Sequence, residues 1–134
     1  MHQMTIQYRG GFRTEAVHLD SQNKIISDAP KDNQGQGQAF SPTDLMSTSL
    51  AQCMLTIMAM KAKGLGWEFP DVSVELEKKM QANPRKVAEI VLRFDWKGLD
   101  QRLSSEQMAT LKDAGMNCPV ALSLDPSVVK TLHW

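Results

Sequence analysis

Residues 39–58 read AFSPTDLMSTSLAQCMLTIM and carry the strongest helix signal in the chain. Ser41 is a favourable N-cap, and Pro42 suits the first helical position because it lacks an N–H that a helix start leaves unpaired. Asp44 follows the cap by three residues, as in an acidic variant of the capping box, and its charge suits the positive end of the helix dipole. The stretch therefore predicts a helix that continues to about Lys63.

Apolar side chains recur along this helix at intervals of three or four residues, at Met46, Leu50, Met54 and Ile57. Cys53 falls on the same stripe, so its side chain is expected to face inward. The opposite face is also rather apolar. This pattern predicts a central helix, or one that is shared with a second subunit.

The segments that flank the helix have the alternation of strands. Short strands are expected between residues 4 and 27, and the polar segment 28–40 is expected to be a surface loop. The glycines of that loop lack the Lys-Ser/Thr of a phosphate-binding loop. Residues 71–96 predict a hairpin that turns at Asn83-Pro84.

The C-terminal third predicts two more helices and a final strand. Ser104 or Ser105 caps a helix that runs to about Ala114, with Gly115 as its stop. A short helix follows Cys118, and residues 128–134 form a last strand. This element order predicts one α+β domain over residues 1–134.

Composition excludes several classes of protein. The chain has 134 residues, 15 Lys plus Arg and 15 Asp plus Glu, so it lacks the positive excess that broad nucleic-acid binding requires. No apolar run reaches the ~20 residues of a membrane-spanning helix, and the first residues do not resemble a secretory signal. We therefore expect a cytoplasmic protein that binds neither nucleic acid nor membrane.

The prediction of function depends mainly on whether the two cysteines, Cys53 and Cys118, are reactive. Their 65-residue separation matches neither a C-x-x-C redox motif nor a zinc site. Cys118 precedes Pro119 at a helix start, where unpaired N–H groups favour a thiolate, whereas Cys53 is surrounded by apolar neighbours. Local physics thus favours Cys118 as the nucleophile. The alternative, two inert core thiols, stays open.

These motifs together resemble the OsmC/Ohr family of osmotically inducible and organic-hydroperoxide-resistance proteins. Pro42, Leu45 and Cys53 match the family's helix start and first cysteine, and NCPVALSL at 117–124 matches the context of its second cysteine. The hairpin VSVELEKKMQANPRKVAEIVLRF at 72–94 is also similar. The resemblance covers nearly the whole chain.

The resemblance implies a fold of antiparallel sheets around a long central helix, in an intertwined homodimer. It also implies an oxidoreductase of the stress response that reduces a small organic hydroperoxide without a metal or bound cofactor. Cys53 would become a sulfenic acid, and Cys118 would resolve it as a disulfide. A dithiol, which is a lipoyl-type reductant in some members, would then reduce that bond. This assignment reverses the preference that local physics gives.

One departure from the family concerns the groups that stabilise the thiolate. Peroxidase members usually carry a Glu directly after the proline, paired with an Arg, whereas this chain has Thr43 there and Asp44 next to it. The candidate cations are Arg13, Lys31 and, less specifically, Arg9.

The organic substrate would need an apolar pocket. The candidates for its wall are the stripe residues Met46, Leu50, Met54 and Ile57. Two other functions stay open: a non-catalytic relative that binds a small apolar ligand at the dimer interface, and a thiol redox sensor.

Overall fold

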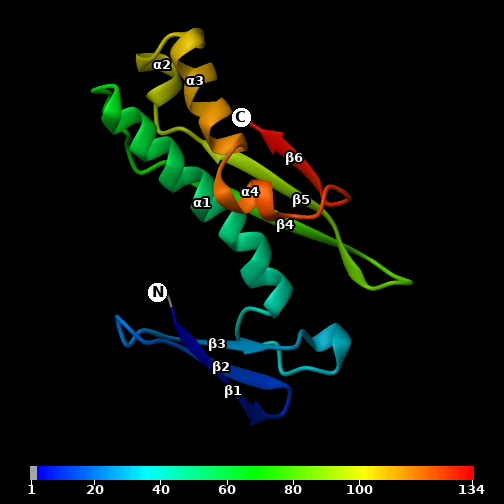
Figure 1. The fold of residues 1–134 in the computed structure, drawn as a ribbon. Helices are drawn as coiled ribbons and strands as arrows, with labels where there is room; N and C mark the ends of the chain where they lie inside the picture. Colours follow the sequence, from blue (N-terminus) through cyan, green and yellow to red (C-terminus); the bar gives the residue numbers. More distant parts are fainter. Residues whose placement is uncertain (1–2) are drawn as a thin grey trace. The chain divides into compact units, whose positions relative to one another are not determined.

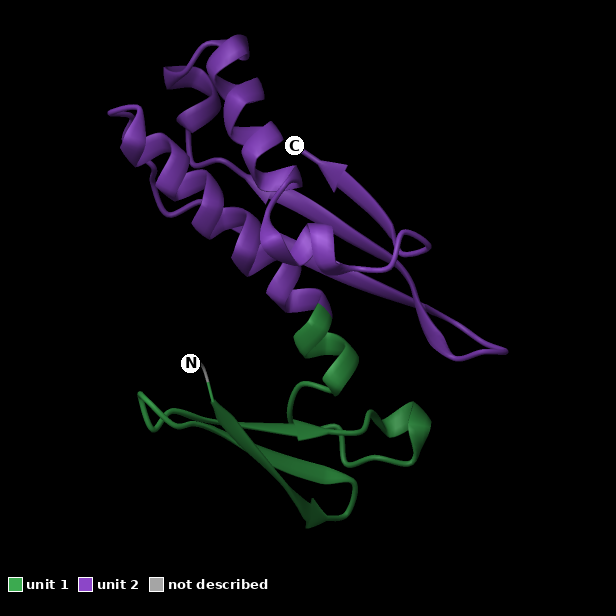
Figure 2. Ribbon diagram, in the orientation of Figure 1, with its two compact units in different colours: residues 1–46 green, residues 47–134 purple. Residues whose placement is uncertain are grey.

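A computed structural model describes residues 3–134 of the chain (Figure 1). The chain forms two compact units, residues 1–46 and residues 47–134 (Figure 2). Helix α1, Pro42–Gly64, begins in the first unit and continues into the second. Its start and length confirm the helix predicted from residues 39–58. The single domain over residues 1–134 stays a prediction.

The first unit is built on a three-stranded antiparallel sheet. Its strands are β1 (Met4–Gly10), β2 (Arg13–His18) and β3 (Lys24–Asp28), in the order β1-β2-β3. Gly10, the last residue of β1, and Gly11 both have positive φ, which glycine adopts without strain, and Gly11 and Phe12 form the turn into β2. In the register of β2 and β3, Arg13 lies opposite Asp28.

The segment after β3 differs from the surface loop that was predicted over residues 28–40. Asp28 is the last residue of β3, it is fully buried, and its backbone N–H donates to the Phe40 carbonyl at 3.0 Å. A short 3-10 helix, η1 (Lys31–Asn33), follows. The prediction was wrong at Asp28 because a polar composition does not reveal an ion pair that offsets the cost of burying a carboxylate.

The second unit contains a mixed sheet of β4 (Ser73–Gln81), β5 (Lys86–Asp95) and β6 (Val129–His133). Strands β4 and β5 form the predicted antiparallel hairpin, whereas β6 pairs with β5 in parallel. The parallel pairing follows from the helical crossover between these strands. The α+β class is confirmed, and the sheets are antiparallel except at β6.

Three helices form that crossover: α2 (Leu99–Arg102), α3 (Ser105–Met116) and α4 (Pro119–Ser123). Ser104 caps α3 in a complete capping box with Gln107. Gly115 was expected to end α3 but lies inside it. A Cβ on Gly115 would lie 2.7 Å from the Met58 methyl carbon, so the glycine permits close packing of α3 against α1.

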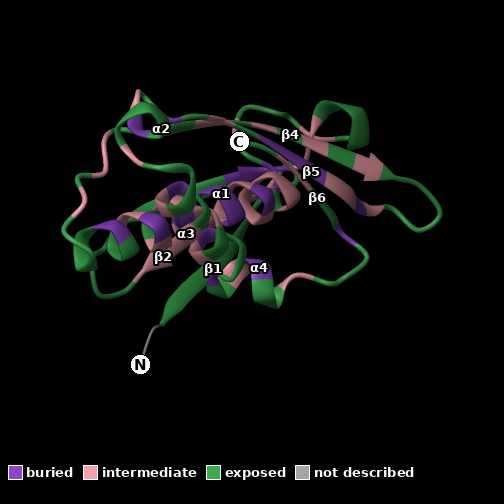
Figure 3. Ribbon diagram, turned by 90° about the horizontal axis from the view of Figure 1, so that it is seen from above, coloured by how far each residue is buried: buried purple, intermediate pink, exposed green. Residues whose placement is uncertain are grey.

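The core of the second unit lies between its helices and its sheet (Figure 3). The buried face of α1 differs by a small rotation from the predicted stripe, and Cys53 lies at its edge, half-buried. Within residues 3–134, no helix is both long enough and apolar enough to span a bilayer. The buried residues of α1 are Ser47, Leu50, Ala51, Met54, Met58 and Ala62.

Candidate functional site

The structure brings the two thiols of the chain together within the second unit. Cys118 is the N-cap of α4, its side chain is 0% exposed, and its Sγ accepts a hydrogen bond from the Ala121 N–H at 3.4 Å. The Cys118 thiol also interacts electrostatically with the thiol of Cys53, which belongs to α1. Both cysteines are reduced. The pair therefore has one fully buried thiol and one half-buried thiol.

The electrostatics of Cys118 do not favour a thiolate at this residue. Burial raises the pKa of the Cys118 thiol, and the Ala121 N–H only partly opposes this effect. The interaction with Cys53 raises the pKa further. Residue 118 does begin a helix, as the sequence indicated, but desolvation outweighs the favourable N–H groups. The surroundings of Cys118 thus favour the protonated thiol over the thiolate.

A small, mainly apolar cavity lies in the second unit, and its lining includes residues near each cysteine in the chain. Its volume is about 150 Å³, and its wall includes Met54 and the α4 residue Ala121. The Lys130 ammonium donates to the Ala121 carbonyl at 3.4 Å and also lines the cavity. Of the four predicted pocket residues, Met54 lines it, Leu50 is buried, and Met46 and Ile57 are half-buried. The remaining wall residues are Met116 and Leu132.

The predicted polar start of α1 is present as a capping box. The Ser41 N–H donates to the Asp44 carboxylate at 2.9 Å, and the Asp44 N–H donates to the Ser41 hydroxyl at 3.1 Å. The Thr43 hydroxyl lies 3.2 Å from the same hydroxyl. Asp44 therefore caps the helix. Stabilisation of a thiolate by Thr43 or Asp44 stays a prediction.

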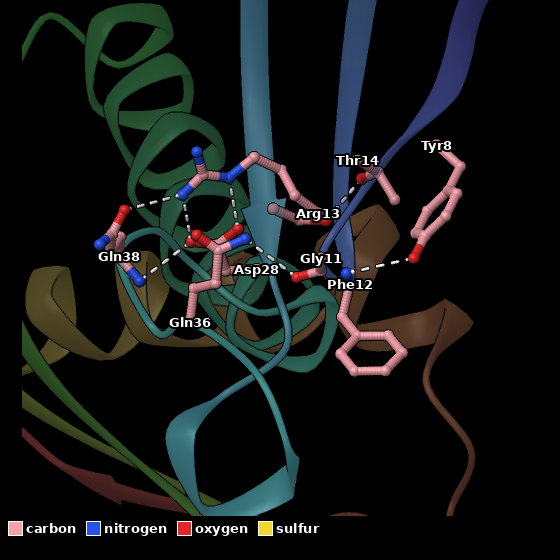
Figure 4. Close-up of polar contacts among 9 residues, drawn as sticks. Tyr8, Gly11, Phe12, Arg13, Thr14, Asp28, Gln36 and Gln38 are labelled. Atoms are coloured by element: carbon pink, nitrogen blue, oxygen red, sulfur yellow. Dashed lines mark hydrogen bonds and ion pairs between the residues drawn. The ribbon is translucent and has the colours of Figure 1, made fainter.

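The first unit holds a second polar arrangement, an ion pair between Arg13 and Asp28 (Figure 4). Arg13 Nε donates to one carboxylate oxygen at 2.7 Å, and its Nη2 donates to the other at 2.8 Å. The Gln38 backbone N–H adds a third bond to the carboxylate at 3.0 Å. Arg13 Nη2 also donates to the Gln38 side-chain oxygen at 3.1 Å.

The other candidate cations have simpler surroundings. Arg9 forms an exposed ion pair with Glu15 on the neighbouring strand, with an N–O distance of 2.9 Å. Lys31 is exposed at the start of η1. Sequence reasoning missed Asp28 and Gln38. The strand register could have identified Asp28. Once the turn between β2 and β3 is placed, antiparallel pairing puts Asp28 opposite Arg13.

Acid should destabilise the protein partly through Asp28. The hydrogen bonds from Arg13 hold the pKa of Asp28 below its usual range, although burial acts in the opposite direction. A lowered pKa in the folded state stabilises the fold above the unfolded-state pKa of about 4 and loses this effect as pH falls through the folded value.

We therefore expect the urea midpoint of the wild type to fall more steeply with decreasing pH, below about pH 4, than that of Asp28→Asn. Glu15→Gln on the same sheet gives the smaller contribution of an exposed pair, because Arg9 also lowers the pKa of Glu15. Equal slopes for the wild type and Asp28→Asn would show that Asp28 does not contribute to acid sensitivity.

Within residues 3–134, no group of three or more His, Cys, Asp or Glu side chains could hold a metal ion.

Comparisons with known proteins place this geometry in a family. The sequence model described as OsmC-like protein matches residues 35–133. A protein from Psychrobacter arcticus, provisionally named as an osmotic stress induced and detoxification response protein, is 41% identical. Its structure aligns with a TM-score of 0.92 over 99% of this chain and 95% of that chain.

Two more distant structures share the fold. The organic hydroperoxide resistance protein OsmC of Legionella pneumophila is 21% identical, with a TM-score of 0.75 over 98% of this chain and 95% of that one. OhrB of Bacillus subtilis, an organic hydroperoxide resistance protein, is 18% identical, with a TM-score of 0.65 over 99% and 96%. No protein with a curated description matches the chain. The family match and the 41% identity show that the chain belongs to the OsmC-like protein family.

Proposed function

We propose that this protein is a thiol-dependent peroxidase that reduces small organic hydroperoxides in the cytosol. The observation that carries the proposal is the electrostatic interaction between a half-buried Cys53 and a fully buried Cys118 whose pKa is raised. A peroxidase cycle needs one thiol that attacks the peroxide and a second that resolves the sulfenic acid. A second thiol that stays protonated does not compete for the peroxide, because the thiolate is the attacking species. A reducing compartment would return both cysteines to the thiol state.

The reaction that we propose has two steps on the protein. The Cys53 thiolate attacks the terminal peroxide oxygen, the O–O bond breaks, and the alkoxide takes a proton and leaves as an alcohol. The Cys118 sulfur then attacks the Cys53 sulfenic acid and forms a disulfide, while the hydroxyl group leaves as water. A dithiol, of lipoyl type or another, supplies the two electrons that reduce the disulfide.

The pocket and the cation of this site are part of the proposal. Met54 is the best-supported pocket residue because it lines the 150 Å³ cavity and directly follows Cys53 in the chain. Met46, Leu50 and Ile57 stay pocket predictions. Arg13 is our first candidate for thiolate stabilisation, with Lys31 second, because a guanidinium held by hydrogen bonds loses less entropy on binding an anion.

We propose that the working form is a homodimer. Three side chains of β1, Met4, Ile6 and Tyr8, alternate onto one face of its sheet and are more than half exposed. A cavity of about 320 Å³ lies in the same unit and is lined by Ile6, Ile25 and other mainly apolar side chains. An apolar sheet face of this kind is costly in water and favours burial against a second subunit.

Thiol titration combined with mass analysis tests the proposal. After one equivalent of cumene hydroperoxide, the wild type should lose two free thiols and about 2 Da, as expected for disulfide formation. Cys53→Ser should keep its remaining thiol. If both thiols of the wild type survive, the peroxidase proposal fails.

Ligand binding without chemistry is the second candidate function, and the 320 Å³ apolar cavity favours it. In that case both thiols would survive the peroxide, and cumyl alcohol would bind the wild type and Cys53→Ser equally. A redox sensor would instead form the disulfide once but would not turn over when a dithiol is supplied.

A further inference from the structure

Lys130 lies on β6 at a position where the strand register favours an apolar side chain. In the parallel pairing of β6 with β5, Lys130 lies opposite Ile90 and Leu132 lies opposite Leu92 (Figure 1). Ile90 and Leu92 are both 0% exposed, and residues two apart in a strand lie on the same face of a sheet. Lys130 therefore belongs to the face of the sheet that carries the core, although its side chain is charged.

The ammonium group of Lys130 has a single, neutral partner. It donates to the Ala121 carbonyl at 3.4 Å, which is long for a hydrogen bond, and within residues 3–134 it forms no ion pair. An ammonium has three N–H donors, so this contact leaves two of them for another acceptor. Ala121 lies on the short helix α4, and a lysine can cap the last carbonyls of a helix. Capping explains the hydrogen bond, but it does not require the lysine to line a cavity.

The cavity that Lys130 lines has an otherwise apolar wall. Its volume is about 150 Å³, and its other lining residues are Met54, Met116, Ala121 and Leu132. Cavities of about this volume hold one benzene ring, so a small aromatic or short aliphatic group fits and a long acyl chain does not. A cation at an apolar cavity matches a ligand with a hydrocarbon part and one acidic group, because the hydrocarbon leaves water while the anion gains an ionic partner.

The cavity is connected to the two cysteines through its wall. The Ala121 N–H donates to Cys118 Sγ at 3.4 Å, and the carbonyl of the same residue accepts from Lys130. Met54 directly follows Cys53 in the chain and also lines the cavity. An acid bound by Lys130 would therefore lie in the part of the second unit that holds both thiols.

We propose that Lys130 determines the substrate specificity of this cavity by binding the carboxylate of a small organic hydroperoxide whose hydrocarbon part occupies the apolar space. The inference rests on the proposed function, which supplies the hydroperoxide. Lys130 binds a part of the substrate that is remote from the O–O bond and takes no part in the chemical steps.

Two alkylating agents of similar size test whether Lys130 attracts an anion. Iodoacetate carries a carboxylate where iodoacetamide carries a neutral amide, and the rates of both with Cys53 are measured in the Cys118→Ser background. The ratio of the two rates cancels a change in the reactivity of the thiolate itself. Lys130→Gln should lower the ratio of the iodoacetate rate to the iodoacetamide rate at least about threefold, whereas Lys130→Arg, which keeps the charge, should leave it within about twofold.

Lys86→Gln is the matched control. Lys86 also belongs to the second unit and donates to a neutral partner, the Ser127 hydroxyl, but it is not among the residues that line the cavity. Its substitution should leave the ratio unchanged. Circular dichroism establishes that each variant is folded. A folded Lys130→Gln protein with the wild-type ratio would overturn the proposal and leave Lys130 as a helix cap only.

A matched pair of substrates extends the test to turnover. The probes are p-carboxycumene hydroperoxide and its methyl ester, which differ in charge and keep the same peroxide. The wild type should have a kcat/KM at least about threefold higher for the acid than for the ester, and Lys130→Gln should lose this preference. Equal values of kcat/KM for the two compounds in an active wild type would contradict the proposal.

A pair of unreactive ligands needs no variant of Lys130, in case Lys130→Gln does not fold. In the Cys118→Ser protein, p-isopropylbenzoate should protect Cys53 from iodoacetamide at a concentration at least about threefold lower than p-isopropylbenzamide. Equal protection by the acid and the amide would overturn the proposal. The alkylation measurements need no peroxidase activity, so an inactive wild type with charge-dependent alkylation would reject the proposed function and keep this inference, whereas an active wild type without charge dependence would do the reverse.

Discussion

Cys53→Ser should abolish turnover of cumene hydroperoxide and lower kcat/KM by on the order of 10³-fold or more. The physical reason is that a serine hydroxyl is hardly ionised near pH 7, whereas a thiolate is the species that attacks an O–O bond. The measurement is a coupled assay with a dithiol as reductant. Retention of more than about a tenth of the activity would contradict the assignment of Cys53 as the attacking residue.

Cys118→Ser is the same substitution at the second cysteine, and it should block turnover without blocking the first reaction with peroxide. Cys53 is still present, so the first peroxide equivalent is consumed at a rate close to that of the wild type. Without a resolving thiol, the sulfenic acid reacts further, and excess peroxide should add about 32 Da as a sulfinic acid. Stoichiometric peroxide consumption that disappears in Cys118→Ser would reverse the two roles.

Leu111→Ala should lower the free energy of unfolding by about 2–5 kcal/mol, the largest stability effect that we expect from a single side chain. Leu111 lies on α3 and is 0% exposed, so the truncation leaves a cavity in the core of the second unit. The neighbouring α3 residue Gly115 already packs closely against Met58, which limits how far the helices can move to fill that cavity.

Leu122→Ala is the control for this measurement, because Leu122 also lies on a helix but is 70% exposed. Its change in the free energy of unfolding should stay within about 0.5 kcal/mol. Urea denaturation of the two variants and the wild type gives all three values. An equal effect of the two substitutions would contradict the burial of Leu111.

Local sequence signals predicted the regular elements of this fold well. The start of α1 follows from Ser41, Pro42 and Asp44, which the structure joins in a capping box. The β4–β5 hairpin follows from alternation, because a strand with one buried face repeats every two residues. The alternation is regular along β4, whereas in β5 the consecutive residues Ile90, Val91 and Leu92 are all buried. Capping and alternation depend on residues a few positions apart, so they can be recognised without knowing the rest of the structure.

Gly115 shows where a local signal fails. A glycine near the end of a helical pattern ordinarily indicates a stop. Here α3 continues to Met116, because the close approach of Met58 requires a residue without a side chain at position 115. Met58 lies 57 positions before Gly115 in the chain (115 − 58), so a local sequence pattern does not reveal this contact.

Local patterns were enough to predict the α+β class, the long helix that carries Cys53 and the helix start that carries Cys118, since capping and periodicity are local properties. Tertiary structure decided the character of the site. Burial gives Cys118 a raised pKa despite its helix-start position, and strand register joins Arg13 to Asp28. Both effects depend on desolvation and on contacts between distant segments, which only the folded chain creates.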